Sequence, residues 1–126
     1  MIFQQLFHQP TDKKCANCNN ILYKNTIFPN TPELLILHIP YANIKIDTSF
    51  KFFYNKRYEL RGVVYYNNNH YTSHIILEDK SVWYHDGIQT GKNMILEKSN
   101  SFYKSKNWNK YNNKNAILFI YIYLTL

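Results

Sequence analysis

The chain has 126 residues, 17% of them aromatic, and a formal net charge of +7. This aromatic content excludes an intrinsically disordered chain, and the length allows one domain or a part of one. The lysines are scattered among asparagines and tyrosines, so the charge does not indicate a nucleic-acid interface, which needs a basic patch. A genome whose codons favour Lys, Asn, Ile, Tyr and Phe gives the same balance without functional meaning.

The first 53 residues predict a helical or irregular start that is followed by short strands. Residues 1–14 are expected to be helical or irregular, and a strand is expected at Ile21–Phe28. Glu33–Ile39 is an apolar run stopped by Pro40, which predicts a buried strand. The alternation of apolar and polar residues in Ile44–Phe53 predicts a further strand or a hairpin.

Tyr58–Gly87 predicts a three-stranded antiparallel meander, because its apolar runs are broken by an asparagine-rich turn and an acidic turn. His70 begins the second strand and Asp86 ends the third, an even number of residues later, so both side chains fall on one face. If the second hairpin pivots on Glu78, these two residues lie directly opposite each other. A carboxylate beside an imidazole fixes its tautomer, as in a catalytic triad. The alternative is a chance polar pair in a long hairpin.

The C-terminal part predicts a loop with a short helix at Thr90–Tyr111 and a final core strand within Ala116–Leu126. This last run is too short for a membrane helix, which needs ~20 apolar residues. The N-terminus lacks the basic region and the apolar core of a signal peptide. We therefore expect an intracellular protein, cytoplasmic or nuclear, without a membrane span or a structural disulfide.

Two cysteines, Cys15 and Cys18, have the C-x-x-C spacing of half a tetrahedral zinc site. No second C-x-x-C pair follows, so either the other ligands lie outside the chain or the pair is a relic. As an alternative, one thiol is a nucleophile that His70 deprotonates. The close spacing of the two cysteines favours the zinc-binding interpretation over this one. His74 shares the parity of His70 and His85 has the opposite parity; both are expected to be ordinary strand histidines.

Four blocks of the chain resemble, in order, the C-terminal half of ubiquitin-specific proteases, a family of papain-like cysteine peptidases. Residues 15–18 are similar to the second zinc knuckle of the family's fingers region, 32–38 to the strand after it, 58–73 to the histidine box, and 83–86 to the tryptophan-to-aspartate segment. The resemblance runs from about residue 13 to the end, where 117–123 resembles the last core strand. It implies a single partial domain over 1–126, with an α+β papain-like fold represented mainly by its antiparallel β half.

The resemblance also implies roles for the matched residues. His70 is the general base that deprotonates the nucleophilic cysteine and then protonates the leaving amine, and Asp86 orients its imidazole. Asn69 and Tyr71 lie at the substrate channel, where Tyr71 walls the passage for a ubiquitin tail. The implied partner is ubiquitin or a ubiquitin-like modifier, and the implied reaction is hydrolysis of an isopeptide bond.

The sequence departs from the family pattern in three ways. Asn69 stands where most members have glycine, and the spacing from tryptophan to Asp86 is one residue shorter than usual, which on a strand moves the later side chains to the opposite face. Nothing in the chain resembles the N-terminal cysteine box or the first zinc knuckle. The chain alone is therefore expected to be inactive, and its partner is a missing N-terminal half that carries the cysteine. Such a half-domain exposes an apolar face, so poor solubility or dimerisation is expected.

The sequence is compatible with three functional classes. The first is a cysteine peptidase whose nucleophile comes from another segment, and the second is an inactive ubiquitin-binding pseudoenzyme. The third, ranked far behind, is a single-stranded nucleic-acid binder, in which interleaved lysines and aromatic residues contact the strand. The contacts of this third class would be Lys104, Lys106, Trp108, Lys110 and Tyr111.

Overall fold

The computed structural model describes residues 8–25, 30–39, 45–52, 56–97, 102–105 and 107–124. The chain forms two compact units, Met1–Thr31 and Pro32–Leu126. The expectation of a single partial domain over residues 1–126 stays a prediction.

The first unit is an antiparallel hairpin of β1 (His8–Lys14) and β2 (Ile21–Asn25). The prediction that residues 1–14 are helical or irregular is wrong for β1, because its backbone pairs with β2 and this long-range pairing overrides weak local preference. Residues 1–7 lie outside the described part of the chain. The predicted strand at Ile21–Phe28 is confirmed for β2, and residues 26–28 are not described.

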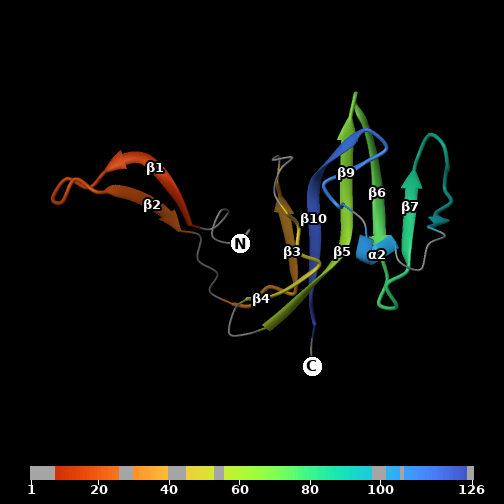
Figure 1. The fold of residues 1–126 in the computed structure, drawn as a ribbon, viewed down its shortest axis with the longest axis horizontal. Coiled ribbons are helices and arrows are strands. Elements are labelled where there is room, and N and C mark those ends of the chain that lie inside the picture. The colour runs from red at the N-terminus through yellow and green to blue at the C-terminus, as the bar shows by residue number, and fades with distance from the viewer. Residues whose placement is uncertain are drawn as a thin grey trace. The chain divides into compact units, whose positions relative to one another are not determined.

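The second unit is a mainly antiparallel sheet in the order β3-β10-β5-β6-β7-β8, with β4 beside β5 and β9 beside β10 (Figure 1). Among the described residues, the helical part is α2 (Phe102–Ser105), within the stretch where a short helix was expected. The strands of this sheet are β3 (Leu34–His38), β4 (Ser49–Phe52), β5 (Lys56–Asn67), β6 (His70–Ile76), β7 (Val82–Asp86), β8 (Ile95–Leu96), β9 (Lys110–Tyr111) and β10 (Lys114–Leu124).

The predicted meander is confirmed as β5, β6 and β7, and asparagines make its first turn possible. Asn68 and Asn69 join β5 to β6 with φ of 51° and 60°. A two-residue hairpin turn of type I′ requires positive φ at both central positions, which asparagine tolerates better than other non-glycine residues. The same chemistry recurs between β9 and β10, where Asn112 and Asn113 have φ of 48° and 63°.

The register of the second hairpin differs from the prediction by two positions. Thr72, rather than His70, lies opposite Asp86, so the hairpin pivots on residue 79 and not on Glu78. The turn is displaced toward the C-terminus from the position that the sequence indicated, and Lys80 within it adopts a positive φ of 68°. His70 and Asp86 are therefore diagonal neighbours, and the even spacing still places them on the same face.

One face of the sheet is the core. Its largest fully buried side chains include Tyr58, Tyr65, Tyr121, Phe119 and Leu60, supplied by the two long central strands β5 and β10. The segment that contains α2 covers this face, since Trp108 is 3% exposed and its ring meets the buried ring of His74.

The strand predicted at Glu33–Ile39 is confirmed as β3, but the prediction that it is buried is wrong. In β3 the side chains alternate, with Leu35 and Leu37 in the core and Leu34 and Ile36 about half exposed. The reason is that β3 is the first strand of the sheet path and only one of its faces is covered. Within the run Ile44–Phe53, the described strand is Ser49–Phe52, and residues 44 and 53 are not described.

The second face of the sheet carries a continuous apolar row. Strand pairing joins, in order across the sheet, Ile36, Ile120, Gly62, Ile75, Trp83 and Leu96. Ile36, Ile75 and Leu96 are 53%, 41% and 45% exposed. A Cβ on Gly62 would lie 3.2 Å from Ile120 Cδ1, so the missing side chain allows Ile120 to lie across the strand. The apolar row is the kind of surface that the sequence predicts for a half-domain.

Candidate functional site

The sheet brings His70 and Asp86 into contact. His70 Nε2 lies 2.9 Å from Asp86 Oδ1, and the two side chains are 21% and 3% exposed. With the carboxylate on Nε2, the neutral imidazole carries its proton there and donates it to Asp86. This leaves Nδ1, the other ring nitrogen, as a lone-pair acceptor. The pair thus has the geometry of a base and the group that orients it.

The backbone after β7 fixes the Asp86 carboxylate. Its Oδ1 accepts the N–H groups of Ile88 at 2.9 Å and Gln89 at 3.3 Å. The Asp86 backbone N–H donates to the Thr90 hydroxyl oxygen, and the Thr90 hydroxyl donates to the Asp86 carbonyl oxygen. Burial by itself raises the pKa of Asp86, but these amides and the His70 ring outweigh it, so the pKa lies below its ordinary value. Asp86 is therefore an anion at neutral pH that cannot rotate away from His70.

A small cavity opens beside this pair. It has a volume of about 180 Å³ and is lined by Asn69, His70, Tyr71, Gly87 and Ile88. Tyr71 is 60% exposed, and its ring lies 4.6 Å from that of Tyr66. The Tyr66 hydroxyl donates to Asn69 Oδ1 at 2.8 Å, which holds the turn in shape. At φ 60°, Asn69 adopts a conformation that glycine also favours, so its presence at this turn is not a steric obstacle.

The other two histidines of the meander make their own hydrogen bonds, separate from this contact. His85 faces away from His70 and bonds to the Gly91 carbonyl oxygen at 2.9 Å. His74 shares the face of His70 but is fully buried, and it belongs to a polar cluster that the sequence did not reveal. No short-range signal points to this cluster, because its members come from four separate segments of the chain.

This buried cluster consists of Tyr65, His74, Glu97 and Tyr111. His74 Nε2 donates to Glu97 Oε1 at 2.9 Å, and the Tyr65 hydroxyl donates to His74 Nδ1 at 2.8 Å. The Tyr111 hydroxyl also donates to Glu97 Oε1, at 2.9 Å. Burial, together with that hydrogen bond, raises the pKa of Tyr111 to about 12, and burial raises the pKa of Tyr65 further. Both phenols therefore stay protonated, and the cluster fastens the residue after β8 to the sheet.

The cysteine pair lies in the first unit, at the tip of the β1–β2 hairpin. Cys15 is half-buried and Cys18 is exposed. The backbone N–H groups of Cys18 and Asn17 hydrogen-bond to the Cys15 sulfur and lower the pKa of its thiol. Among the described residues, no group of three or more His, Cys, Asp or Glu side chains is placed to hold a metal ion. The donor set thus fits half of a structural zinc site and not a whole one.

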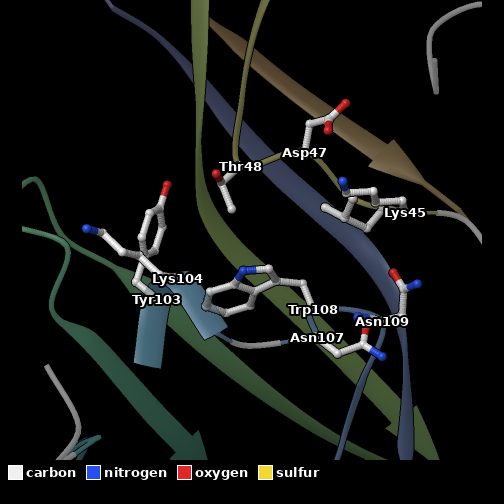
Figure 2. Close-up of a pocket in the computed structure, with 9 residues that line it drawn as sticks. Lys45, Asp47, Thr48, Tyr103, Lys104, Asn107, Trp108 and Asn109 are labelled. Atoms are coloured by element: carbon white, nitrogen blue, oxygen red, sulfur yellow. Dashed lines mark hydrogen bonds between the residues drawn. The ribbon is translucent and has the colours of Figure 1, made fainter. Parts of the chain in front are cut away.

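A larger cavity, of about 470 Å³, shares no lining residue with the one at His70. Figure 2 shows Lys45, Asp47 and Thr48 on one side of it and Tyr103 and Lys104 on the other, with the Trp108 ring between them. Its lining joins Lys45, Lys104 and Asp47 to amide side chains, and it contains neither an imidazole nor a thiol.

The residues of the nucleic-acid alternative are not arranged for base stacking. Trp108 is 3% exposed, and Tyr111 is half-buried with its hydroxyl bonded to Glu97. Stacking on bases needs an exposed aromatic face. Lys106, a further contact of that alternative, lies outside the described residues.

No protein-family model and no curated protein sequence matches the chain. The structure is similar to a chain of the SAGA Ubp8/Sgf11/Sus1/Sgf73 DUB module, with a TM-score of 0.58 and 14% identity over 95% of this chain and 29% of that one. The fold is similar to part of a DUB module. A structure of this module bound to monoubiquitin also matches, with a TM-score of 0.52 and 14% identity over 95% of this chain and 31% of that one.

These likenesses concern the fold. They confirm the prediction of a mainly antiparallel β-sheet with almost no helix, and the chain spans about three-tenths of the chains that it matches. Within the described part of the chain, none of the helices is long and apolar enough to span a membrane.

Proposed function

We propose that the chain is the β portion of a papain-like, ubiquitin-specific-protease-like cysteine peptidase. In this proposal, His70 is the general base and Asp86 orients it, for a nucleophilic thiol that lies outside these 126 residues. The observation that carries the proposal is the 2.9 Å contact between His70 Nε2 and the buried carboxylate of Asp86. The likeness to part of a DUB module supports it.

The chemistry derives from the two ring nitrogens. With Nε2 bonded to Asp86, Nδ1 accepts the proton of the thiol, and the resulting thiolate attacks the carbonyl carbon of the isopeptide bond. The negative charge of Asp86 stabilises the imidazolium that forms. The imidazolium then donates its proton to the leaving amine. The acyl group stays on the sulfur atom as a thioester. Water attacks the thioester while Nδ1 takes a proton from it, and release of the acid restores the thiol.

The cavity beside His70 supports a narrow substrate channel. Asn69, Tyr71 and Ile88 line it, and none of them carries a formal charge. A glycine-glycine tail is the substrate class that suits a small cavity beside a tyrosine ring, because it has no side chains to accommodate. The proposed substrate is therefore a protein joined to ubiquitin or a ubiquitin-like modifier.

The test compares the chain with a longer form that includes the in-frame segment upstream of Met1. The 126-residue chain is expected to give no turnover of a fluorogenic ubiquitin substrate, since a base without a nucleophile cannot form the acyl-enzyme. The longer form is expected to turn over and to lose about 10²-fold or more in kcat when His70 is replaced by alanine. His85→Ala is the matched control, because His85 faces away from the site. Turnover by the longer form that His70→Ala leaves intact would sink the proposal.

The alternative is a pseudoenzyme that binds ubiquitin without cleaving it. It is favoured by the Tyr71 ring beside the cavity, which is 60% exposed. Titration of labelled ubiquitin with the chain distinguishes the two. Binding that is unaffected by His70→Ala, combined with no turnover in any longer form, would favour the pseudoenzyme.

A further inference from the structure

The outer edge of β3 carries backbone groups that no described strand satisfies. β3 lies at one end of the sheet, with β10 on its inner side, and within the described residues no strand bonds to its outer side (Figure 1). An edge strand of this kind presents a row of N–H and C=O groups that can pair with another strand. The partner that satisfies such a row is a second extended backbone.

The hydrogen bonds to β10 show which groups of β3 point outward. The Tyr123 N–H donates to the Glu33 carbonyl oxygen at 2.9 Å, and the Ile39 N–H donates to the Ile117 carbonyl oxygen at 3.1 Å. In an antiparallel ladder every second residue bonds to the same neighbour, so the odd-numbered residues from 33 to 39 bond to β10. The residues whose backbone groups point away from the sheet are therefore Leu34, Ile36 and His38.

This edge lacks the features that usually protect a strand edge. The pairing of β3 with β10 contains no bulge, and β3 contains neither proline nor a residue with a formal charge. Residues 25–44 include no lysine or arginine, although the chain has 15 of them. Leu34 and Ile36 are 52% and 53% exposed. Natural sheets blunt an exposed edge with lysine, proline or a bulge, so we expect this edge to accept a strand.

A second copy of β3 matches this edge along its whole length. When two copies pair antiparallel with full overlap, Ile36 meets Ile36 of the second copy, and Leu34 meets His38 of the second copy. These are the outward-pointing residues, so each such pair exchanges both backbone hydrogen bonds. A shift of one residue would set core-facing side chains opposite solvent-facing ones. No like charges meet in this register, because β3 carries none.

We propose that two copies of this chain pair antiparallel along the outer edges of their β3 strands, about a two-fold axis at Ile36. The interface is isologous and joins the two sheets into one. The apolar row starts at Ile36 in each copy, so it continues across the axis, and the exposed side chain of Ile36 gains a neighbour. This inference does not rest on the proposed peptidase function.

A single cysteine at the axis tests the register. In a chain that carries Cys15→Ser and Cys18→Ser, Ile36→Cys places two thiols opposite each other, with Cα atoms about 5.5 Å apart, a distance that a disulfide spans. Oxidised glutathione is expected to convert this variant to a covalent dimer on a non-reducing gel. Leu34→Cys in the same background is the matched control. Its two copies lie roughly 13 Å apart along the strands, so its dimer yield should be lower by about fivefold or more.

A proline at the axis tests the backbone hydrogen bonds. Ile36→Pro removes an outward N–H and no bond to β10, and an edge strand tolerates proline at such a position. Sedimentation velocity is expected to show a dimer for the wild-type chain and a monomer for Ile36→Pro. Ile36→Thr keeps the N–H and the branched Cβ, so it should weaken the dimer less than proline does. Ile75 lies in β6, away from this edge, and Ile75→Lys is expected to retain the Ile36→Cys cross-link.

Three results would each overturn the inference. They are a wild-type chain that stays monomeric, equal cross-linking through positions 34 and 36, and an Ile36→Pro variant that is folded and as dimeric as the wild type. If Ile36→Pro does not fold, the contrast between the two cysteine variants still decides the matter. Loss of the proposed peptidase function would show in the turnover assay alone and would leave the cross-link unchanged.

Discussion

Replacement of Glu97 by alanine tests whether the buried cluster holds the end of β8 against the sheet. Glu97 Oε1 accepts hydrogen bonds from His74 Nε2 and from the Tyr111 hydroxyl, both at 2.9 Å. Alanine removes the acceptor for both donors. Glutamine keeps a carbonyl oxygen at the same position, so Glu97→Gln is the matched control.

The expected loss depends on the burial of the two donors. A buried donor left without its partner costs about 1–3 kcal/mol. The His74 side chain is completely buried and should incur most of this cost, whereas the Glu97 side chain is 17% exposed, so water can reach the Tyr111 hydroxyl in part. We therefore expect Glu97→Ala to lower the free energy of unfolding by about 2–4 kcal/mol, and Glu97→Gln by less than about 1 kcal/mol.

The measurement is urea denaturation of the wild-type chain and of both variants, monitored by tryptophan fluorescence. Because the variants expose the same surface on unfolding, the slope m should be unchanged while the midpoint shifts. A loss below about 0.5 kcal/mol for Glu97→Ala, or equal losses for the two variants, would show that these hydrogen bonds do not stabilise the fold.

Three further perturbations probe the candidate site, the apolar row and the central strands. The lowered pKa of Asp86 means that this carboxylate stabilises the folded state above its unfolded pKa of about 3.9, and that this stabilisation is lost as the pH falls through the folded pKa. Melting temperatures of Asp86→Asn should therefore fall less steeply than those of the wild type below about pH 4, and equal slopes would contradict this account. Ile75→Lys, in the middle of the apolar row, should reduce self-association measured by light scattering in the presence of a chelator. Unchanged association would mean that copies of the chain do not associate through this row. Gly62→Val should destabilise the chain by about 1–3 kcal/mol, because a Cβ added at this position lies 3.2 Å from Ile120 Cδ1. Adding Ile120→Ala to this variant should recover part of that loss, and no recovery would point to another cause.

Local chemistry explains why the meander could be predicted. Positive-φ asparagines join β5 to β6, and the alternation of buried and exposed side chains in β6 and β7 agrees with the residue types. The same alternation placed His70 and Asp86 on one face and His85 on the other. The register was wrong by two positions, because the turn at Lys80 depends on a backbone conformation that the residue type alone does not specify.

Other parts of the structure depend on pairing between distant segments. His8–Lys14 is a strand because it pairs with β2, although its composition does not favour a strand. β3 exposes half of its apolar side chains because of its place at the start of the sheet path, which no local pattern encodes. The buried cluster around His74 needs Glu97 and Tyr111 to arrive from segments that lie far along the chain.

The sequence by itself determined the meander, the shared face of residues 70 and 86, and the close spacing of Cys15 and Cys18, because each depends on strand periodicity, turn residues or short spacing. Tertiary structure decided the hydrogen bond from His70 to Asp86, the amides that hold that carboxylate, and the buried hydrogen-bond cluster, since these contacts depend on register and on long-range packing. Periodicity fixes the face on which a side chain lies, whereas only the pairing of strands fixes which side chain it meets.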